Sequence, residues 1–129
     1  MDEKLRDAGM AVRREVLGAE YVDRAVAGAD DFNKPFQAIL NESCWGLCWT
    51  DDTLTKQQRS ILNLGMLAAL GRTHEFKLHF KGALQNGLTP EQLRAALIQI
   101  AVYCGIPAGV ESFRAAREAF QEIEKEKGA

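Results

Sequence analysis

Arg72-Thr-His-Glu-Phe-Lys-Leu-His79 is the stretch around which the rest of the chain is organised. It follows the most apolar run of the sequence, Leu64–Leu70, and it contains both histidines. Farther along, Asn86-Gly87 supplies the glycine that commonly follows the last turn of a helix. We therefore expect a helix over about 72–86, with an apolar helix before it.

The side chains of this helix divide into three sets at roughly 100° per residue. The set expected to face the core contains Phe76, Phe80, Ala83 and Leu84. The set expected to face solvent contains His74, Lys77, Lys81 and Gln85. The third set, which we call the polar seam, lies at the edge of the core face and contains Glu75, His79, Gly82 and Asn86, with Arg72 beside it.

The remainder of the chain is also predicted to be helical, because no segment shows sustained strand alternation. Two Thr-x-x-Gln sequences, at Thr55 and Thr89, have the form of a capping box at a helix start. The expected helices lie at about 3–17, 19–27, 32–48, 55–70, 72–86, 89–104 and 108–125. The fold class is therefore all-α, with six or seven helices and no linker or repeat.

Length and charge restrict the function. The 129 residues suffice for one domain, and the formal charge of −2 comes from acidic and basic residues mixed along the chain. No basic block suggests a nucleic acid and no cationic amphipathic face suggests a membrane surface. The longest apolar run is too short to span a bilayer, and the charged N-terminus lacks a signal-peptide pattern, so we expect a cytoplasmic protein.

Two helices carry more apolar surface than a small domain can cover. The helix ending at Leu70 is apolar nearly all round beyond its first turn, which is typical of a helix buried on all sides. Ile98, Val102 and Tyr103 form a second apolar side on the helix over 89–104. Both features predict association with other copies of the chain.

Cys44, Cys48 and Cys104 are the three cysteines. An odd number argues against a disulfide framework, and Cys44 and Cys48 without a third ligand make a poor zinc site. Two interpretations stay open: reduced cysteines of the core, or a redox pair formed by Cys44 and Cys48.

The same segment contains Trp45 and Trp49 around Gly46. Two large aromatic side chains beside a glycine bury much surface and let backbones approach closely. They predict either a packing corner or subunit contact, or one wall of a ligand pocket.

Glu75 and His79 are the residues best placed for chemistry, because side chains four residues apart on a helix can meet. A nearby carboxylate is expected to raise the pKa of the imidazole and to fix its tautomer. Such a histidine could donate a proton or stabilise an enolate, and Arg72 could bind an anionic substrate. The alternative is an ion pair at the surface with a histidine that is satisfied at the core edge.

Several segments together resemble one family. These are Asp7–Arg14 with Val16-Leu-Gly18, Asp31-Phe-Asn33, Trp45-Gly46, Trp49-Thr50, Glu75-x-Lys-x-His79 with Asn86-Gly87, and Tyr103-Cys-Gly-Ile-Pro-Ala108. In order and spacing the sequence is similar to the carboxymuconolactone decarboxylase family, closest to its γ-carboxymuconolactone decarboxylase branch. That family shares its fold with the AhpD-type alkylhydroperoxidases.

The resemblance implies one AhpD-like helical domain over residues 1–129, assembled as a ring-like homo-oligomer, a hexamer or alternatively a trimer. The implied activity is loss of CO2 from 4-carboxymuconolactone, or a related lactone acid, to give the 3-oxoadipate enol-lactone in aromatic-compound degradation. Neither a cofactor nor a metal is implied. By position, Glu75 and His79 would be catalytic. The residues expected to bind substrate are Arg72, Trp45, Trp49 and Arg114.

The sequence departs from the family pattern at the loop after Trp49, where Asp51-Asp52-Thr53 replaces an Arg-Pro-Gly sequence. A negative loop is unfavourable for a dianionic substrate, so the substrate stays open. Two other functions compete: a thiol peroxidase that uses Cys44 and Cys48, and a non-catalytic oligomer that binds a small acid. The CxxC motif of the peroxidase branch is absent, since Arg72 and Glu75 stand at its positions.

Overall fold

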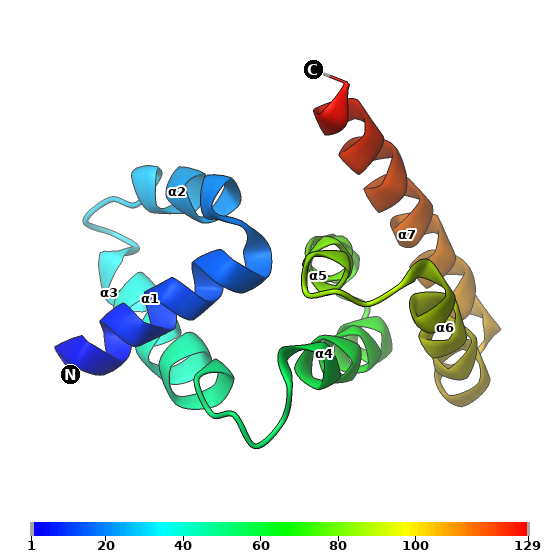
Figure 1. Cartoon of the computed structure of the whole chain (residues 1–129), viewed down its shortest axis with the longest axis horizontal. Helices are drawn as coiled ribbons and strands as arrows, with labels where there is room; N and C mark the ends of the chain where they lie inside the picture. Colours follow the sequence, from blue (N-terminus) through cyan, green and yellow to red (C-terminus); the bar gives the residue numbers. More distant parts are fainter. Residues whose placement is uncertain (1, 129) are drawn as a thin grey trace. The chain divides into compact units, whose positions relative to one another are not determined.

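The computed structural model describes residues 2–128, which contain seven α-helices, one π-helix and no strand (Figure 1). In chain order these are α1 Glu3–Leu17, α2 Ala19–Ala27, α3 Lys34–Ile39, η1 Leu40–Trp49, α4 Lys56–Leu70, α5 Thr73–Gln85, α6 Pro90–Cys104 and α7 Ile106–Lys127. The all-α fold class is confirmed. None of the described helices is both long and apolar enough to cross a membrane.

The predicted boundaries hold to within two or three residues except in the third helix. That helix begins at Lys34 and changes at Leu40 into a π-helix that ends at Trp49. The helix start at Thr89 is confirmed in detail, because the Thr89 hydroxyl accepts from the Gln92 amide at 3.1 Å and the Gln92 side chain accepts from the Thr89 amide at 2.9 Å. The capping box at Thr55 stays a prediction.

The chain divides into two compact units, with the boundary between Lys56 and Gln57. In the first unit α1 packs on η1 (Figure 1). The two backbones are closest at Gly9 and Gly46, where a Cβ atom on Gly9 would lie 2.6 Å from the Gly46 nitrogen. The close approach of backbones that was expected at Gly46 is therefore confirmed. In the same unit Trp45 and Trp49 pack with Val16 in a small core.

The second unit contains α4–α7, and α5 supplies the centre of its core. Phe76, Phe80 and Ala83 are buried as predicted, and Leu84 packs against them. The core also contains Leu64, Leu88, Leu93, Leu97, Ile100, Ala115, Ala116 and Ala119. The predicted core face of α5 is confirmed, so the polar seam beside it has a defined orientation.

Lys77 and Lys81 were expected to face solvent, and this prediction is wrong. Their ammonium groups lie 2.8 and 2.9 Å from the two carboxylate oxygens of Glu122 on α7. The reason is the length of α7, whose 22 residues run along the side of α5 that carries both lysines. These ion pairs join α5 to α7.

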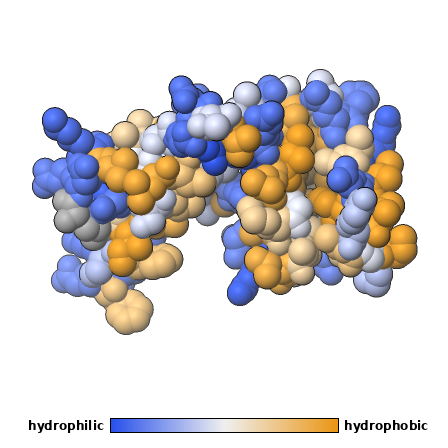
Figure 2. Space-filling view, turned by 90° about the horizontal axis from the view of Figure 1, so that it is seen from below, coloured by the Kyte–Doolittle hydropathy of each residue, from blue (hydrophilic) through white to orange (hydrophobic). Residues whose placement is uncertain are grey.

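The apolar helix α4 is not buried on all sides within the chain. Leu64 is fully buried, whereas Ile61, Leu62 and Met66 are 39%, 52% and 47% exposed. Hydrophobic side chains also lie on the surface of this unit in Figure 2. A groove of about 410 Å³ runs between these α4 side chains and Ile100, Tyr103 and Cys104 of α6.

Candidate active site

Glu75 and His79 lie one turn apart on α5, at the edge of the core face that Phe76 and Phe80 hold in place. His79 is half-buried, whereas His74 is exposed, as the helical angles predicted. The two histidines therefore have different environments. Only His79 has the partly dry surroundings that can alter the chemistry of an imidazole.

Asn63 of α4 is the neighbour that sequence reasoning missed. Its side-chain nitrogen Nδ2 lies 3.4 Å from Nδ1 of His79. An amide nitrogen donates, so in this arrangement Nδ1 of His79 accepts and the neutral ring carries its hydrogen on Nε2. The contact with Asn63 thus assigns the ring hydrogen of neutral His79 to Nε2.

The pKa of His79 is lowered to about 4, because burial penalises the charged imidazolium. The negative charge of Glu75 acts in the opposite direction and raises the pKa, but it is the smaller effect. The expectation that Glu75 would raise the pKa of His79 above its ordinary value is therefore wrong in its net direction. At neutral pH His79 is an uncharged hydrogen-bond donor.

The polar seam continues beyond His79 along the interface of α5 with α4. Asn86 donates from Nδ2 to the Ser60 hydroxyl at 3.0 Å, and its carbonyl accepts from Gln57 at 3.0 Å. Gln57, Ser60 and Asn63 follow one another at intervals of three residues in the first half of α4. These three polar residues form a row on a helix that is otherwise apolar. Their spacing is the sequence signal that could have identified the side of α4 that faces the polar seam of α5.

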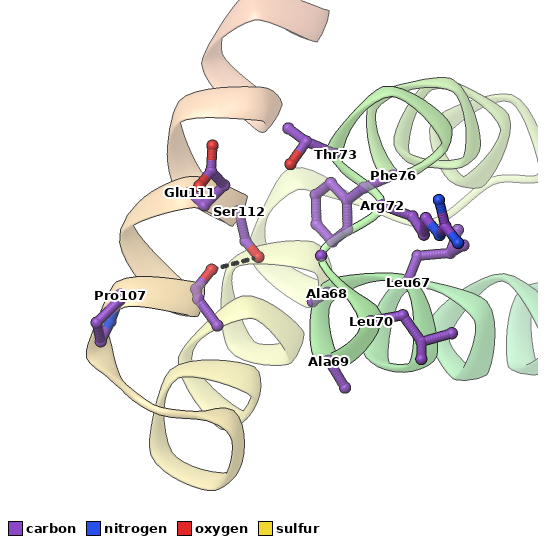
Figure 3. Close-up of a pocket in the computed structure, with 12 residues that line it drawn as sticks. Leu67, Ala68, Ala69, Leu70, Arg72, Thr73, Phe76, Pro107, Glu111 and Ser112 are labelled. Carbon is purple, nitrogen blue, oxygen red and sulfur yellow. Dashed lines mark hydrogen bonds between the residues drawn. The ribbon is translucent and has the colours of Figure 1, made fainter.

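Arg72 lies at a pocket of about 300 Å³ at the turn between α4 and α5 (Figure 3). Leu67 and Leu70 of α4 and Phe76 of α5 give it apolar walls, and Ser112 on α7 borders it. The Ser112 hydroxyl donates to the Ala108 carbonyl of its own helix at 2.8 Å, so its proton is already engaged. Arg72 is the cationic group of this pocket and is exposed.

Arg72 precedes His79 by seven residues, which corresponds to about 10 Å along a helix. Glu75 lies between them in sequence, one turn before His79. Arg72, Glu75 and His79 therefore follow one another along α5 and the turn that precedes it.

The other predicted substrate-binding residues belong to other elements, Arg114 to α7 and the two tryptophans to η1. Arg114 is 64% exposed, and its Nη1 lies 3.9 Å from Oε1 of Glu111, which also lines the Arg72 pocket. Trp45 and Trp49 belong to the first unit and are only 3% and 5% exposed, since they fill its core. They form the packing corner that the sequence allowed, and a role in substrate binding stays a prediction for all three.

The cysteines do not form a common buried group. Cys44 is half-buried, whereas Cys48 and Cys104 are exposed in the chain, so the expectation of core cysteines is wrong for these two. Burial, with a smaller effect of Cys48, raises the pKa of Cys44. Since the thiolate is the reactive form, this environment disfavours the chemistry that a redox pair requires. Among residues 2–128 no three His, Cys, Asp or Glu side chains are grouped to hold a metal ion.

Residues 34–118 match the model of the carboxymuconolactone decarboxylase family. The chain belongs to this family. It is 39% identical to the nitrosuccinic acid decarboxylase npaB of Metarhizium robertsii, over 87% of this chain and 78% of that protein. It is 33% identical to the 4-carboxymuconolactone decarboxylase of Acinetobacter baylyi, over 95% of this chain and 91% of that protein. As a family member with these relatives it is a carboxy-lyase of the carboxymuconolactone decarboxylase type.

Proposed function

We propose that the protein removes CO2 from 4-carboxymuconolactone or a related acid in which the leaving carboxylate is conjugated to an electron sink. With the lactone, the products are CO2 and the 3-oxoadipate enol-lactone. The observation that carries the proposal is the arrangement of Glu75, His79 and Asn63, in a chain whose relatives are named decarboxylases.

The chemistry requires no electron acceptor outside the substrate. When the bond between the carboxylate and the ring breaks, its electron pair moves through the conjugated system to the lactone carbonyl and produces a dienolate. A proton then adds to carbon to complete the product. The protein has to bind the acidic groups, stabilise the dienolate oxygen and deliver that proton.

His79 is suited to the dienolate oxygen. Because Asn63 occupies Nδ1 and burial keeps the ring neutral, the ring hydrogen is the one on Nε2. A neutral donor stabilises the developing negative charge without first losing a proton to solvent. Glu75, one turn away, relays to carbon the one proton that bulk solvent supplies to replace the departing CO2, and Arg72 binds a carboxylate of the substrate.

The identity of the acid depends on groups that differ from the usual pattern of the family. The loop that follows η1 carries Asp51 and Asp52, both exposed, where a positive group is usual in the family. Nitrosuccinic acid, named for one relative, also carries a carboxylate on a carbon beside an electron-withdrawing group. The shared requirement is an electron sink next to the leaving carboxylate.

Release of CO2 from the purified protein tests the proposal with two candidate substrates. Incubation with 4-carboxymuconolactone or with nitrosuccinate should give stoichiometric CO2 from at least one of them. Saturable binding of both acids without CO2 would instead indicate a protein that binds small acids. The ratio of the two kcat/KM values assigns the substrate class.

We also propose that the protein works as a ring-like homo-oligomer, with a hexamer as the expected form. The groove between α4 and α6, together with the exposed Ile98, Val102 and Tyr103, gives an apolar surface that a second copy would cover. Native mass spectrometry should show six copies, or three in the alternative assembly. Met66→Asp, which puts a charge in the groove, should shift the protein to smaller species, and a monomeric wild type would contradict the assembly.

A further inference from the structure

We propose that the second unit carries a separate binding site for a small aromatic carboxylate, in a pocket between α5, α6 and α7. The pocket has a volume of about 310 Å³ and lies on the side of α5 that carries Phe80. It has none of its lining residues in common with the Arg72 pocket, and neither Glu75 nor His79 lines it. It is therefore distinct from the candidate active site.

The apolar surface of this pocket is suited to a ring. Phe80 and Leu97 are 1% exposed and form part of a floor that is fixed by the core. Phe113 and Phe120, two turns apart on α7, are 41% and 38% exposed and stand at its sides. The Phe120 ring meets Phe80 edge to face, with 5.4 Å between centroids, so its orientation is set before a ligand arrives. Aromatic rings prefer such offset or edge contacts.

The charges at this pocket select an anion. Arg94 of α6 and Arg117 of α7 both line it, and in the described part of the chain neither has a carboxylate partner. Arg114 differs on both counts, since it lies outside the pocket and has Glu111 within 3.9 Å. Two arginines against the single acidic residue Glu91 leave an excess of one positive charge, which a monocarboxylate neutralises. The planar guanidinium is the side chain best matched to a carboxylate.

The size of the pocket favours a small molecule over a protein segment. Ligand pockets usually have volumes of about 300–1,000 Å³, and this one is at the lower end of that range. A substituted benzoate is of the right size to lay its ring on Phe113 and Phe120 and its carboxylate between Arg94 and Arg117. A second copy of the chain covering the same face is the competing occupant.

Benzoate is the probe that tests the site, with benzyl alcohol and acetate as matched controls. In a titration followed by backbone amide NMR of the intact protein, benzoate should shift the signals of Phe113, Arg117 and Phe120 in a saturable way. Benzyl alcohol lacks the charge and acetate lacks the ring, so each should bind at least about threefold more weakly. His79→Ala should leave the benzoate shifts unchanged, which separates this site from the candidate active site.

Substitution of the arginines supplies the second test. Exposed ion pairs contribute about 0.2–1 kcal/mol each, so Arg94→Gln and Arg117→Gln should each weaken benzoate binding about threefold, and the double variant about tenfold. Arg24→Gln, which removes the same charge from α2, should have no effect. Unchanged affinity in the double variant would overturn the site. The site would also be overturned if benzoate shifted none of these amide signals, which is the result expected if another copy of the chain covers the pocket.

Discussion

Asn63 Nδ2 lies 3.4 Å from Nδ1 of His79, so a residue of the preceding helix orients the imidazole that we propose to be catalytic. The amide of Asn63 leaves Nε2 as the hydrogen donor of the neutral ring. Asn63 is thus a positioning residue in the proposed mechanism, and its substitution can be distinguished from a purely structural change.

Asn63→Ala should lower kcat about three- to tenfold with little change in KM, because it removes a hydrogen bond of about 1 kcal/mol that fixes the tautomer. Asn63→Asp should in addition move the acid limb of the pH profile to higher pH, since a carboxylate beside Nδ1 raises the pKa of His79. Ser60→Ala is the control. Ser60 lies three residues before Asn63 on α4 and contacts Asn86, so this variant should keep the wild-type kcat. An unshifted profile in Asn63→Asp would exclude the positioning role.

The free energy of unfolding should depend on pH through His79. Its pKa is about 4 in the folded protein against 6.5 ordinarily, so below pH 6.5 the unfolded chain binds a proton that the folded chain does not. Stability should therefore fall by at most about 3 kcal/mol as the pH drops from 6.5 to 4, with no further contribution from His79 below 4. Urea unfolding of wild type and His79→Gln across this range isolates the difference, and parallel curves would contradict the low pKa.

Glu122→Gln should weaken the attachment of α7 to α5. Glu122 accepts from Lys77 and Lys81, and these contacts lower its pKa. The side chains involved are 24% to 41% exposed, so the expected loss is about 1 kcal/mol or less, and it should shrink as the pH falls below the ordinary pKa of a glutamate. Glu118→Gln, which removes a longer ion pair of 3.8 Å between Glu118 and Lys77, should lose less in the same thermal unfolding assay.

Gly46→Ala should destabilise the first unit. An added Cβ would lie 2.8 Å from the Leu5 carbonyl oxygen and 3.0 Å from that of Asn41, so backbone would have to move, at a cost of about 1–3 kcal/mol. Trp45 and Trp49 are the two tryptophans of the chain and both belong to this unit. Their fluorescence during urea unfolding therefore reports it selectively.

The control for this change is Gly65→Ala, since an added Cβ at Gly65 meets nothing within 4 Å in the chain and replaces glycine in the interior of α4. Gly65→Ala should leave the tryptophan transition where it is. A Gly46→Ala protein whose transition is also unmoved would show that the two backbones are not in contact.

Hydrophobic spacing predicted the helices that bury an apolar face, α5 and α6 most clearly. The core positions of α5 follow directly from residues 76, 80 and 83, and the helix start at Thr89 follows from local hydrogen-bonding chemistry. The π-helix at Leu40–Trp49 was not predicted, because an apolar pattern reports which side is buried and not how tightly the backbone winds.

The candidate site was predicted only in part, because sequence spacing relates residues of one helix and not residues of different helices. Glu75 and His79 share one helix, so their spacing was sufficient to predict that their side chains lie close together. Asn63 lies on another helix, and a tertiary neighbour has no fixed spacing in sequence. The sign of the pKa change at His79 failed for the same reason, since burial by surrounding elements outweighed the local charge of Glu75.

The most direct test of the central claim is the rate of CO2 release from the substrate that the wild type turns over, measured for Glu75→Gln and His79→Ala with folding checked by circular dichroism. If Glu75 supplies the proton and His79 stabilises the dienolate, each variant should lose at least about 10²-fold in kcat/KM. Wild-type rates in either folded variant would contradict the assignment of that residue to the active site.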